Sequence, residues 1–230
     1  MSEILDKQSE LEAVGPAFLK EKMLEMRAKT RKAIHAIAAG CKAGMVEEDA
    51  VEMAKDILAA EDMLRGWHDI YVRFGSNTLK TFGAPSDPGV ILKENDIFLI
   101  DIGPVWGEFE GDGGDTFTVG TAPEMAKCGA DAKKLFHLVR KKWESTGMSG
   151  KELYDFAIVE AKAMGWELNM DLSGHRLSDF PHAAIYDGPM ADVDFKPSPL
   201  LWVLEIHIRH PSEGYGAFFE DMLLDDSYFV

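Results

Sequence analysis

The chain has 230 residues, of which 46% are hydrophobic and 28% charged, and its formal net charge is −16 at pH 7. This length suits one large domain or two small ones. The excess of acidic residues argues against nucleic acid and anionic membranes as partners. No stretch approaches the roughly 18 apolar residues that a membrane helix needs.

The N-terminal segment and the cysteines indicate a compartment. Residues 1–15 are polar and acidic, without the basic-then-apolar pattern of a secretory signal. The chain has two cysteines, Cys41 and Cys128, which do not resemble a disulfide framework. We therefore expect a cytoplasmic protein, because the cytoplasm keeps thiols reduced.

The first quarter of the chain has helical periodicity. Apolar residues in 17–44 recur three and four positions apart, at Leu19, Met23, Met26, Ala33, Ile34 and Ile37. Gly44 is expected to end this helix. A second helix with acidic residues in its first turn is predicted over residues 46–64.

Short β-branched and aromatic stretches follow after Gly66. They predict strands over residues 69–75, 96–103 and 114–120. Helices then return and are followed by strands, with helices expected over 124–147 and 149–165 and strands over 200–210 and 217–224. The sequence therefore predicts an α+β fold.

Two parts of this pattern repeat at nearly the same distance. A Gly-Met pair at 44–45 recurs at 147–148, an offset of 103, and Asp101 within an apolar strand recurs as Glu205, an offset of 104. Matching offsets favour a duplicated helix–helix–strand–strand unit. Paired halves would bring equivalent strands around a shared centre, where Asp101 and Glu205 would face each other.

Four acidic residues occupy parallel places in the two copies: Asp101, Asp112, Glu205 and Glu220. Asp112 lies on the far arm of the hairpin that Asp101 begins, so the two side chains can converge. A buried unpaired carboxylate costs several kcal/mol. Taken singly, each acid could end a strand, occupy a turn or lie on the surface. Together they favour a metal site, since two divalent ions would neutralise four charges.

The segment "SGHRLSDFPH" places His175 and His182 seven residues apart before the last strands. His175 is the best candidate for a neutral nitrogen ligand. Oxygen-rich ligation with one imidazole suits Mn²⁺, Fe²⁺, Co²⁺ or Zn²⁺. His35 and His137, in helical segments, are expected to pack or to lie at the surface, and His207 and His210, near the end of a strand, are expected to face solvent.

This ordered set of motifs, from "LIDIG" through "GDGGDTFTVG", "SGH" and "LEIHI" to "FFEDMLL", resembles the pita-bread metallopeptidases. That family includes methionine aminopeptidases, aminopeptidase P and prolidase. The resemblance covers about residues 23–224. It implies one catalytic domain over residues 1–230, with halves of about 20–120 and 121–230, pseudo-two-fold symmetry and a curved, mostly antiparallel sheet.

The resemblance also implies a ligand set for two divalent ions. Asp101 would chelate one ion, His175 and Glu205 would bind the other, and Asp112 and Glu220 would bridge them. In the family the two ions hold a water or hydroxide that attacks the amide. The ions also polarise the amide carbonyl.

Three further residues take their expected roles from the same resemblance. Asp112 fits the family register better than Asp115, since Phe117 lies five residues after it. His182 matches a second family histidine that contacts substrate. Glu205 would accept a proton and His182 would steady the tetrahedral intermediate.

The substrate pocket departs from the family pattern at several positions. The family has a histidine five residues after an asparagine, and Phe82 stands at that place after Asn77. Phe218 replaces an arginine that proline-specific members carry two residues before the last glutamate. Arg176 and Ser178 stand where glycines are usual. The metal site is therefore expected to be intact and the pocket rebuilt.

Two features near the pocket have alternative interpretations. His68 could replace the missing histidine, or it could be an ordinary histidine near the start of a strand. The aromatic residues Trp67, Trp106, Phe82 and Phe218 could line an apolar pocket or belong to the core.

The leading hypothesis is a dinuclear metal-dependent hydrolase of an amide bond, acting on a peptide N-terminus, a dipeptide or a small non-peptide amide. Prolidase and aminopeptidase P activity is disfavoured by Phe218 and by the absence of their extra N-terminal domain among these residues. The case for methionine aminopeptidase activity is weakened by Phe82, which stands in the place of the family histidine. One alternative is an iron-dependent oxygen-activating enzyme, and another is a non-catalytic binding module. A homodimer is one option for its assembly.

Overall fold

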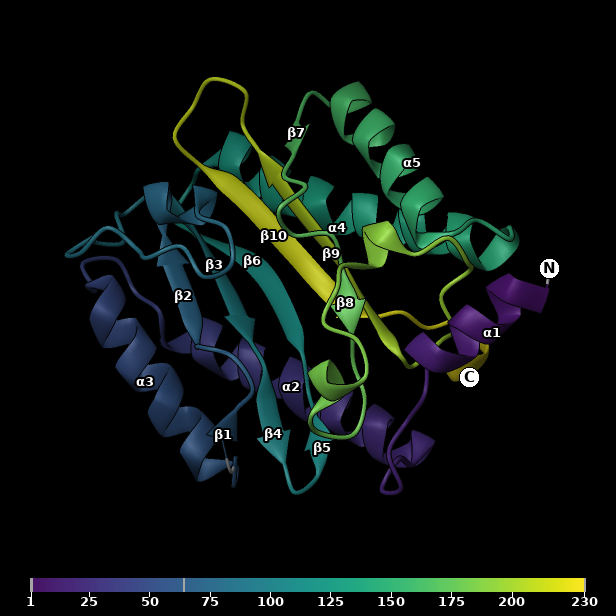
Figure 1. The fold of residues 1–230 in the computed structure, drawn as a ribbon. Coiled ribbons are helices and arrows are strands. Elements are labelled where there is room, and N and C mark those ends of the chain that lie inside the picture. Colours follow the sequence, from purple (N-terminus) through teal and green to yellow (C-terminus); the bar gives the residue numbers. More distant parts are fainter. Residues whose placement is uncertain (1, 64, 230) are drawn as a thin grey trace.

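A computed structural model describes residues 2–63 and 65–229 of the chain. A seven-stranded sheet runs through it in the order β2-β3-β6-β10-β9-β7, and β8 also pairs with β9 (Figure 1). Its strands are β2 (Tyr71–Phe74), β3 (Asp96–Ile102), β6 (Gly113–Val119), β7 (Glu167–Leu168), β8 (His175–Arg176), β9 (Trp202–Arg209) and β10 (Gly216–Met222). The pairs described between them are antiparallel.

A smaller sheet of β1 (Arg65–Gly66), β4 (Pro104–Trp106) and β5 (Phe109–Glu110) lies within the β3–β6 connection and before β2. The helices are α1 (Ser2–Leu11), α2 (Lys20–Gly40), α3 (Glu47–Ala60), α4 (Pro123–Ser145) and α5 (Gly150–Ala163). Short 3₁₀ turns are η1 (Gly75–Leu79), η2 (His182–Ala184), η3 (Met190–Asp192) and η4 (Asp226–Phe229). The predicted α+β class with an antiparallel sheet is confirmed.

Most element predictions agree with the structure to within a few residues. The first predicted helix is shorter than expected, because the backbone of Cys41 is already extended (φ −71°, ψ 128°) before Gly44 is reached. Leu64, the last residue of the second predicted helix, lies outside the described residues. The separate helix α1 was not predicted.

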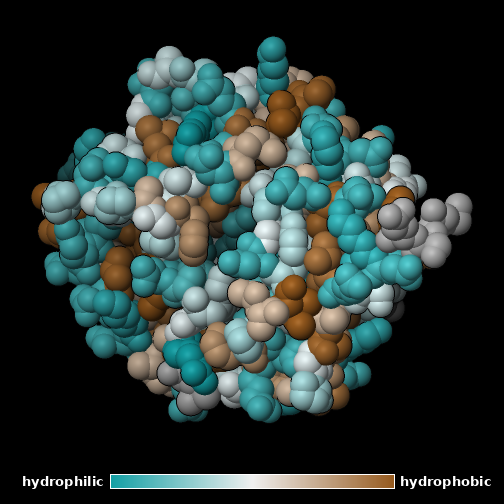
Figure 2. Space-filling model, in the orientation of Figure 1, coloured by the Kyte–Doolittle hydropathy of each residue, from teal (hydrophilic) through white to brown (hydrophobic). Residues whose placement is uncertain are grey.

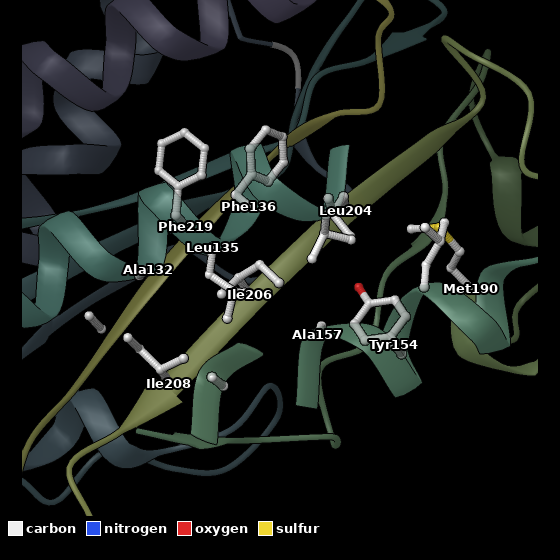
Figure 3. Packing of buried hydrophobic residues seen from close by; sticks show 14 of the residues in the cluster. Ala132, Leu135, Phe136, Tyr154, Ala157, Met190, Leu204, Ile206, Ile208 and Phe219 are labelled. Atoms are coloured by element: carbon white, nitrogen blue, oxygen red, sulfur yellow. The ribbon is translucent and has the colours of Figure 1, made fainter. Parts of the chain in front are cut away.

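The sheet has two faces with different environments. On β9 and β10 alternate apolar side chains, such as Leu204, Ile206 and Phe219, pack against α4 and α5 (Figure 3). A second cluster packs β2 and β3 against α2 and α3. In Figure 1, α2 and α4 pass behind the sheet. Because side chains alternate along a strand, the intervening residues point to the other face.

The order of elements repeats along the chain. The segment α2-α3-β2-β3-β6 is followed by α4-α5-β8-β9-β10, apart from the small strands. The last strands of the two segments, β6 and β10, pair at the middle of the sheet. Asp101 on β3 and Glu205 on β9 therefore lie on the strands that flank this central pair. None of the helices in residues 2–63 and 65–229 is both long and apolar enough to cross a bilayer.

Candidate metal centre

A row of four register partners crosses the middle of the sheet. Asp101 on β3 is paired with Gly114 on β6, Gly114 with Glu220 on β10, and Glu220 with Glu205 on β9. Asp112 lies two residues before Gly114, so it points to the same face. The row and Asp112 together place four carboxylates, from segments far apart in the sequence, on one side of the sheet.

The glycine within this row leaves room for its neighbours. An added Cβ at Gly114 would overlap the ring of Phe218 and lie 3.1 Å from Oε1 of Glu220. A larger residue there would force the Phe218 ring to move and would crowd Glu220. The small side chain thus belongs to the construction of the site.

Asp115 points away from this cluster. Its Oδ2 lies 2.6 Å from Nη2 of Arg31 on α2, on the helix-covered face of the sheet. The odd spacing between Asp112 and Asp115 sends the two carboxylates to opposite faces. Asp112 is the one that lies beside the other acids.

His175 reaches the cluster from β8, at the edge of β9. Its Nδ1 lies 2.6 Å from the carbonyl oxygen of Arg176, and its Nε2 lies 2.9 Å from Oδ2 of Asp112. A neutral ring that donates from Nδ1 presents the lone pair of Nε2 to the site. This is the tautomer that a metal ligand requires.

A backbone N–H and a side-chain hydroxyl hold Glu205 in place. The backbone N–H of Gly174 donates to Oε2 of Glu205 at 2.6 Å, and the hydroxyl of Tyr154 donates to its carbonyl oxygen at 3.0 Å. Gly174 has φ +73°, a left-handed conformation that glycine adopts without strain. These contacts aim the glutamate side chain into the cluster.

Burial and mutual repulsion perturb the ionisation of the acids. Burial, together with the charges of Asp112 and Asp101, raises the pKa of Glu205 to about 7 and that of Glu220 well above its usual range. Burial likewise raises the pKa of Asp101. Without positive charge nearby, the group cannot be fully ionised near neutral pH.

The histidines act in the opposite direction. Burial by itself would raise the pKa of Asp112, but hydrogen bonds and charge from His175 and His68 lower it to about 2. Burial would lower the pKa of His175, but Asp112 more than offsets this and raises it to about 10. The site is therefore one that cations of either kind, protons or metals, stabilise.

The donor set fits divalent metal ions. Oε1 of Glu220 is buried and has no hydrogen-bond partner, and Oδ2 of Asp112 is buried beside Nε2 of His175. Ligand atoms of Asp112, His175 and Glu220 lie within 4.8 Å of one another, as do those of His68, Asp101 and Asp112. Carboxylate oxygens with imidazole nitrogens suit Mn²⁺, Fe²⁺, Co²⁺ or Zn²⁺.

The cluster opens into a cavity of about 230 Å³. Figure 2 shows the hollowed face of the molecule in the orientation of Figure 1. All five predicted ligands line it, namely Asp101, Asp112, His175, Glu205 and Glu220. His182, His68, Trp67 and Phe82 also line it.

The sequence analysis did not identify Glu110, which holds His182. Glu110 is buried, its Oε2 lies 2.7 Å from Nδ1 of His182, and its Oε1 accepts from the backbone N–H of His182 at 3.0 Å. This leaves Nε2 of His182 as the ring nitrogen available to a substrate. The only signal in the sequence was an acid inside the short segment "GEFEGD".

His68 and Phe82 meet at one side of the cavity, with their ring centroids 5.5 Å apart. Phe82 is 48% exposed, whereas the side chain of His68 is only 4% exposed. Trp67 packs its indole ring against His68, His175 and His182.

Two residues that we expected at the pocket lie elsewhere. Arg176 is fully buried and donates to the carbonyl oxygens of Leu201 and Ala13, because it follows His175 in β8 and so points the opposite way. Phe218 is buried in a small apolar cluster with Leu99 and Leu172. Neither lines the cavity.

Trp106 takes the core alternative, whereas another expectation differs from the structure. Trp106 is buried, and its indole N–H donates to the carbonyl oxygen of Glu61 away from the cavity. His207 was expected to face solvent, but it is 1% exposed. Nε2 of His207 lies 2.8 Å from the carbonyl oxygen of Thr78, and Nδ1 lies 3.0 Å from Nδ2 of Asn169. Local alternation did not reveal the loop that covers it.

Solved structures with this fold include an X-Pro aminopeptidase from Thermotoga maritima, with a TM-score of 0.72 and 17% identity over 88% of this chain and 56% of that chain. A prolidase from Pyrococcus furiosus has a TM-score of 0.69 and 17% identity, over 88% and 60%. The His350Ala variant of Escherichia coli aminopeptidase P has a TM-score of 0.67 and 16% identity, over 91% and 53%.

At such identities these similarities establish the fold. This chain spans 53–60% of the length of those three proteins. No curated protein sequence matched it. The sequence profile of metallopeptidase family M24 matches residues 21–224, most of the chain. The chain therefore belongs to metallopeptidase family M24, with the α+β fold of the pita-bread metallopeptidases.

Proposed function

We propose that this chain hydrolyses an amide bond with the help of two divalent metal ions. Asp101 would hold one ion, and His175 and Glu205 would hold the other. Asp112 and Glu220 would bridge the two ions. The observation that carries this proposal is the convergence of these five side chains on one cavity, where a buried carboxylate oxygen of Glu220 has no hydrogen-bond partner. Membership of the M24 family supports it.

The roles of the chain's own groups follow from their positions. When bound, a pair of divalent ions would supply an activated water and polarise the amide carbonyl. Glu205 borders the cavity and, held through Oε2 by Gly174, would accept the proton released in the attack. His182, held at Nδ1 by Glu110, would direct Nε2 at the reacting centre and steady the substrate there.

The cavity lining favours a substrate with a free amino group. Among the described residues that line it there is no lysine or arginine, whereas two exposed acids, Asp171 and Asp187, lie there. A substrate carboxylate would find no cationic partner, but an ammonium group would. The rings of Trp67 and Phe82 would pack against an apolar side chain. We therefore favour the N-terminal residue of a peptide, or a small amino-acid amide, over a dipeptide anchored by its carboxylate.

The metal and the compartment remain part of the proposal. The ligand set suits manganese, cobalt, iron or zinc and does not distinguish among them. Both cysteines, Cys41 and Cys128, are free and buried, which suits the reducing cytoplasm.

The proposal is tested by purifying the chain without oxygen, counting its metal ions, and assaying it with each metal added back. The matched substrates are an amino-acid amide, its N-acetylated form and a dipeptide with a free carboxylate. We expect two ions per chain and cleavage of the free amide in preference to the other two. Glu220→Gln should lose metal and activity, whereas Asp87→Asn, an exposed control outside the cavity, should lose neither.

Two results would overturn this function. Iron-dependent oxygen uptake without amide cleavage would indicate an oxygen-activating enzyme. A correctly folded wild-type chain that binds no divalent ion would indicate a binding module.

A further inference from the structure

A second histidine enters the cluster of acids, from the loop that precedes β2. Nε2 of His68 lies 3.5 Å from Oδ1 of Asp101 and 3.5 Å from Oδ1 of Asp112. Its side chain is only 4% exposed. His68 therefore lies inside the site, beside two of the five ligands proposed above.

The ring of His68 is oriented like that of His175. Nδ1 of His68 lies 2.6 Å from the carbonyl oxygen of Asp69, and Nδ1 of His175 lies 2.6 Å from that of Arg176. In each case the backbone carbonyl of the next residue favours a proton on Nδ1. The lone pair of Nε2 then points at the carboxylates, as it does in metal-bound histidines.

The backbone around His68 is built to admit its ring. Gly103 follows β3, and a Cβ there would overlap Cδ2 and Nε2 of His68. The backbone N–H of Trp67 donates to the carbonyl oxygen of Gly103 at 2.9 Å, and the Trp67 indole N–H donates to that of Gly111 at 3.0 Å. These contacts fix the loop on both sides of the site.

The repeated order of elements gives His68 and His175 corresponding places. His68 precedes β2, which pairs with β3 and contributes Tyr71 opposite Asp101. His175 begins β8, which pairs with β9, the strand that carries Glu205. Each flanking strand of the site thus has its own carboxylate and a histidine from the segment at its outer edge.

We propose that His68 is a sixth protein ligand, which binds the same ion as Asp101 and gives each ion of the pair one imidazole. This inference rests on the proposed function. Two ligand atoms bound at about 2.1 Å and a tetrahedral angle lie about 3.4 Å apart, close to the observed separations. A sixth ligand with nitrogen in place of water would favour cobalt, iron or zinc over manganese at that position.

Two other roles for His68 predict different measurements. As a substrate contact, it would affect the KM for the amide and leave metal binding unchanged. As a protonated counter-ion of Asp101 and Asp112, it would compete with the metal, so its removal would tighten metal binding. If His68 is a ligand, its removal weakens the binding of one ion.

The experiment compares wild type, His68→Gln, His68→Ala and the control His35→Gln, which changes an exposed histidine on α2. Metal affinity and stoichiometry are measured by titration calorimetry with Co²⁺ and Mn²⁺. Nitrogen couplings to bound Mn²⁺ are measured by pulsed EPR. We expect wild type and His35→Gln to bind two ions and to show coupling from two imidazoles. Both His68 variants should show one imidazole and at least tenfold weaker binding of one ion.

The outcomes separate this inference from the proposed function. If wild type binds two ions and both His68 variants keep both affinities and both nitrogen couplings, His68 is not a ligand, although the proposed function stands. If wild type binds no ion, the proposed function fails. Circular dichroism and thermal melts of each variant establish that a lost ion does not reflect a lost fold.

Discussion

Glu205 and Glu220 are register partners on the paired strands β9 and β10, with both side chains buried on the same face of the sheet. Like charges directly opposite each other destabilise a strand pair. Burial raises the pKa of Glu205 to about 7 and that of Glu220 well above its usual value. The middle of the sheet is consequently stable only when protons or metal ions neutralise these acids.

Removal of metal should make stability depend steeply on pH. A carboxyl group with a raised folded-state pKa stabilises the fold below its unfolded pKa, and this contribution is lost as pH rises through the folded value. For Glu205 the window runs from about pH 4.5 to about pH 7. The metal-free chain should therefore lose about 3 kcal/mol of unfolding free energy over this window from that group.

Urea unfolding at pH 5, 6, 7 and 8, with and without a chelator, measures this effect. The raised pKa values of His68 and His175 act in the same direction at higher pH. Metal should flatten the profile, and Glu205→Gln should reduce its slope without metal. A slope that is the same with and without chelator would contradict the explanation.

Asp112 and Asp115 form a matched pair of acids with different predicted effects. Asp112→Asn should abolish binding of at least one ion, because a neutral amide is a poor bridge between two cations. Asp115→Asn should keep both ions but lose about 1–2 kcal/mol of stability, because Arg31 loses its partly buried partner. Metal content and urea unfolding are measured for both variants. Loss of metal in Asp115→Asn but not in Asp112→Asn would show that Asp115 is the ligand.

Glu110→Gln should impair catalysis without removing metal. Glu110 contacts Nδ1 of His182 at 2.7 Å and does not line the cavity, so we regard it as a positioning residue. Loss of its charge should lower kcat about tenfold to a hundredfold, with little change in KM, since the interaction matters most as charge develops on the substrate.

The control for this prediction is Glu108→Gln, an exposed acid two residues earlier on the same segment. It should leave kcat, KM and metal content unchanged. A loss of metal in Glu110→Gln, or a kcat equal to that of wild type, would argue that Glu110 is merely structural.

His207 should make the fold sensitive to acid. Burial, with repulsion from Arg209 and Arg73, lowers its pKa to about 4 even though Thr78 accepts a hydrogen bond from it. A histidine with a lowered folded-state pKa stabilises the fold above its unfolded pKa of about 6.5, and this contribution is lost as pH falls towards 4.

The fold should lose about 3 kcal/mol of unfolding free energy from His207 as the pH falls from 6.5 to 4. His207→Gln should be less stable at pH 7 but should show a weaker decline over this range. Unfolding of the metal-free forms, measured alongside His35→Gln, isolates this group. An equal decline in both variants would show that His207 does not contribute.

The sequence by itself determined the class of fold and the position of the acids on their strands. Alternation with a period of two is a local property, so an acid among apolar residues, as at Asp101 and Glu205, already indicates a carboxylate facing away from a packed helix layer. Helices α2 to α5 likewise follow from local periodicity and glycine positions. The order of the five candidate ligands could therefore be read directly along the chain.

Only the tertiary structure decided which segments meet. Arg31 on α2 forms an ion pair with Asp115, and Glu110 contacts Nδ1 of His182. The loop before β2 places His68 in the site. Each contact joins residues many positions apart, so it depends on how distant segments pack rather than on the pattern around either residue. Arg176 and Phe218 were misplaced for the same reason, since neighbours in sequence to candidate ligands can lie in the core once strands alternate and loops cover them.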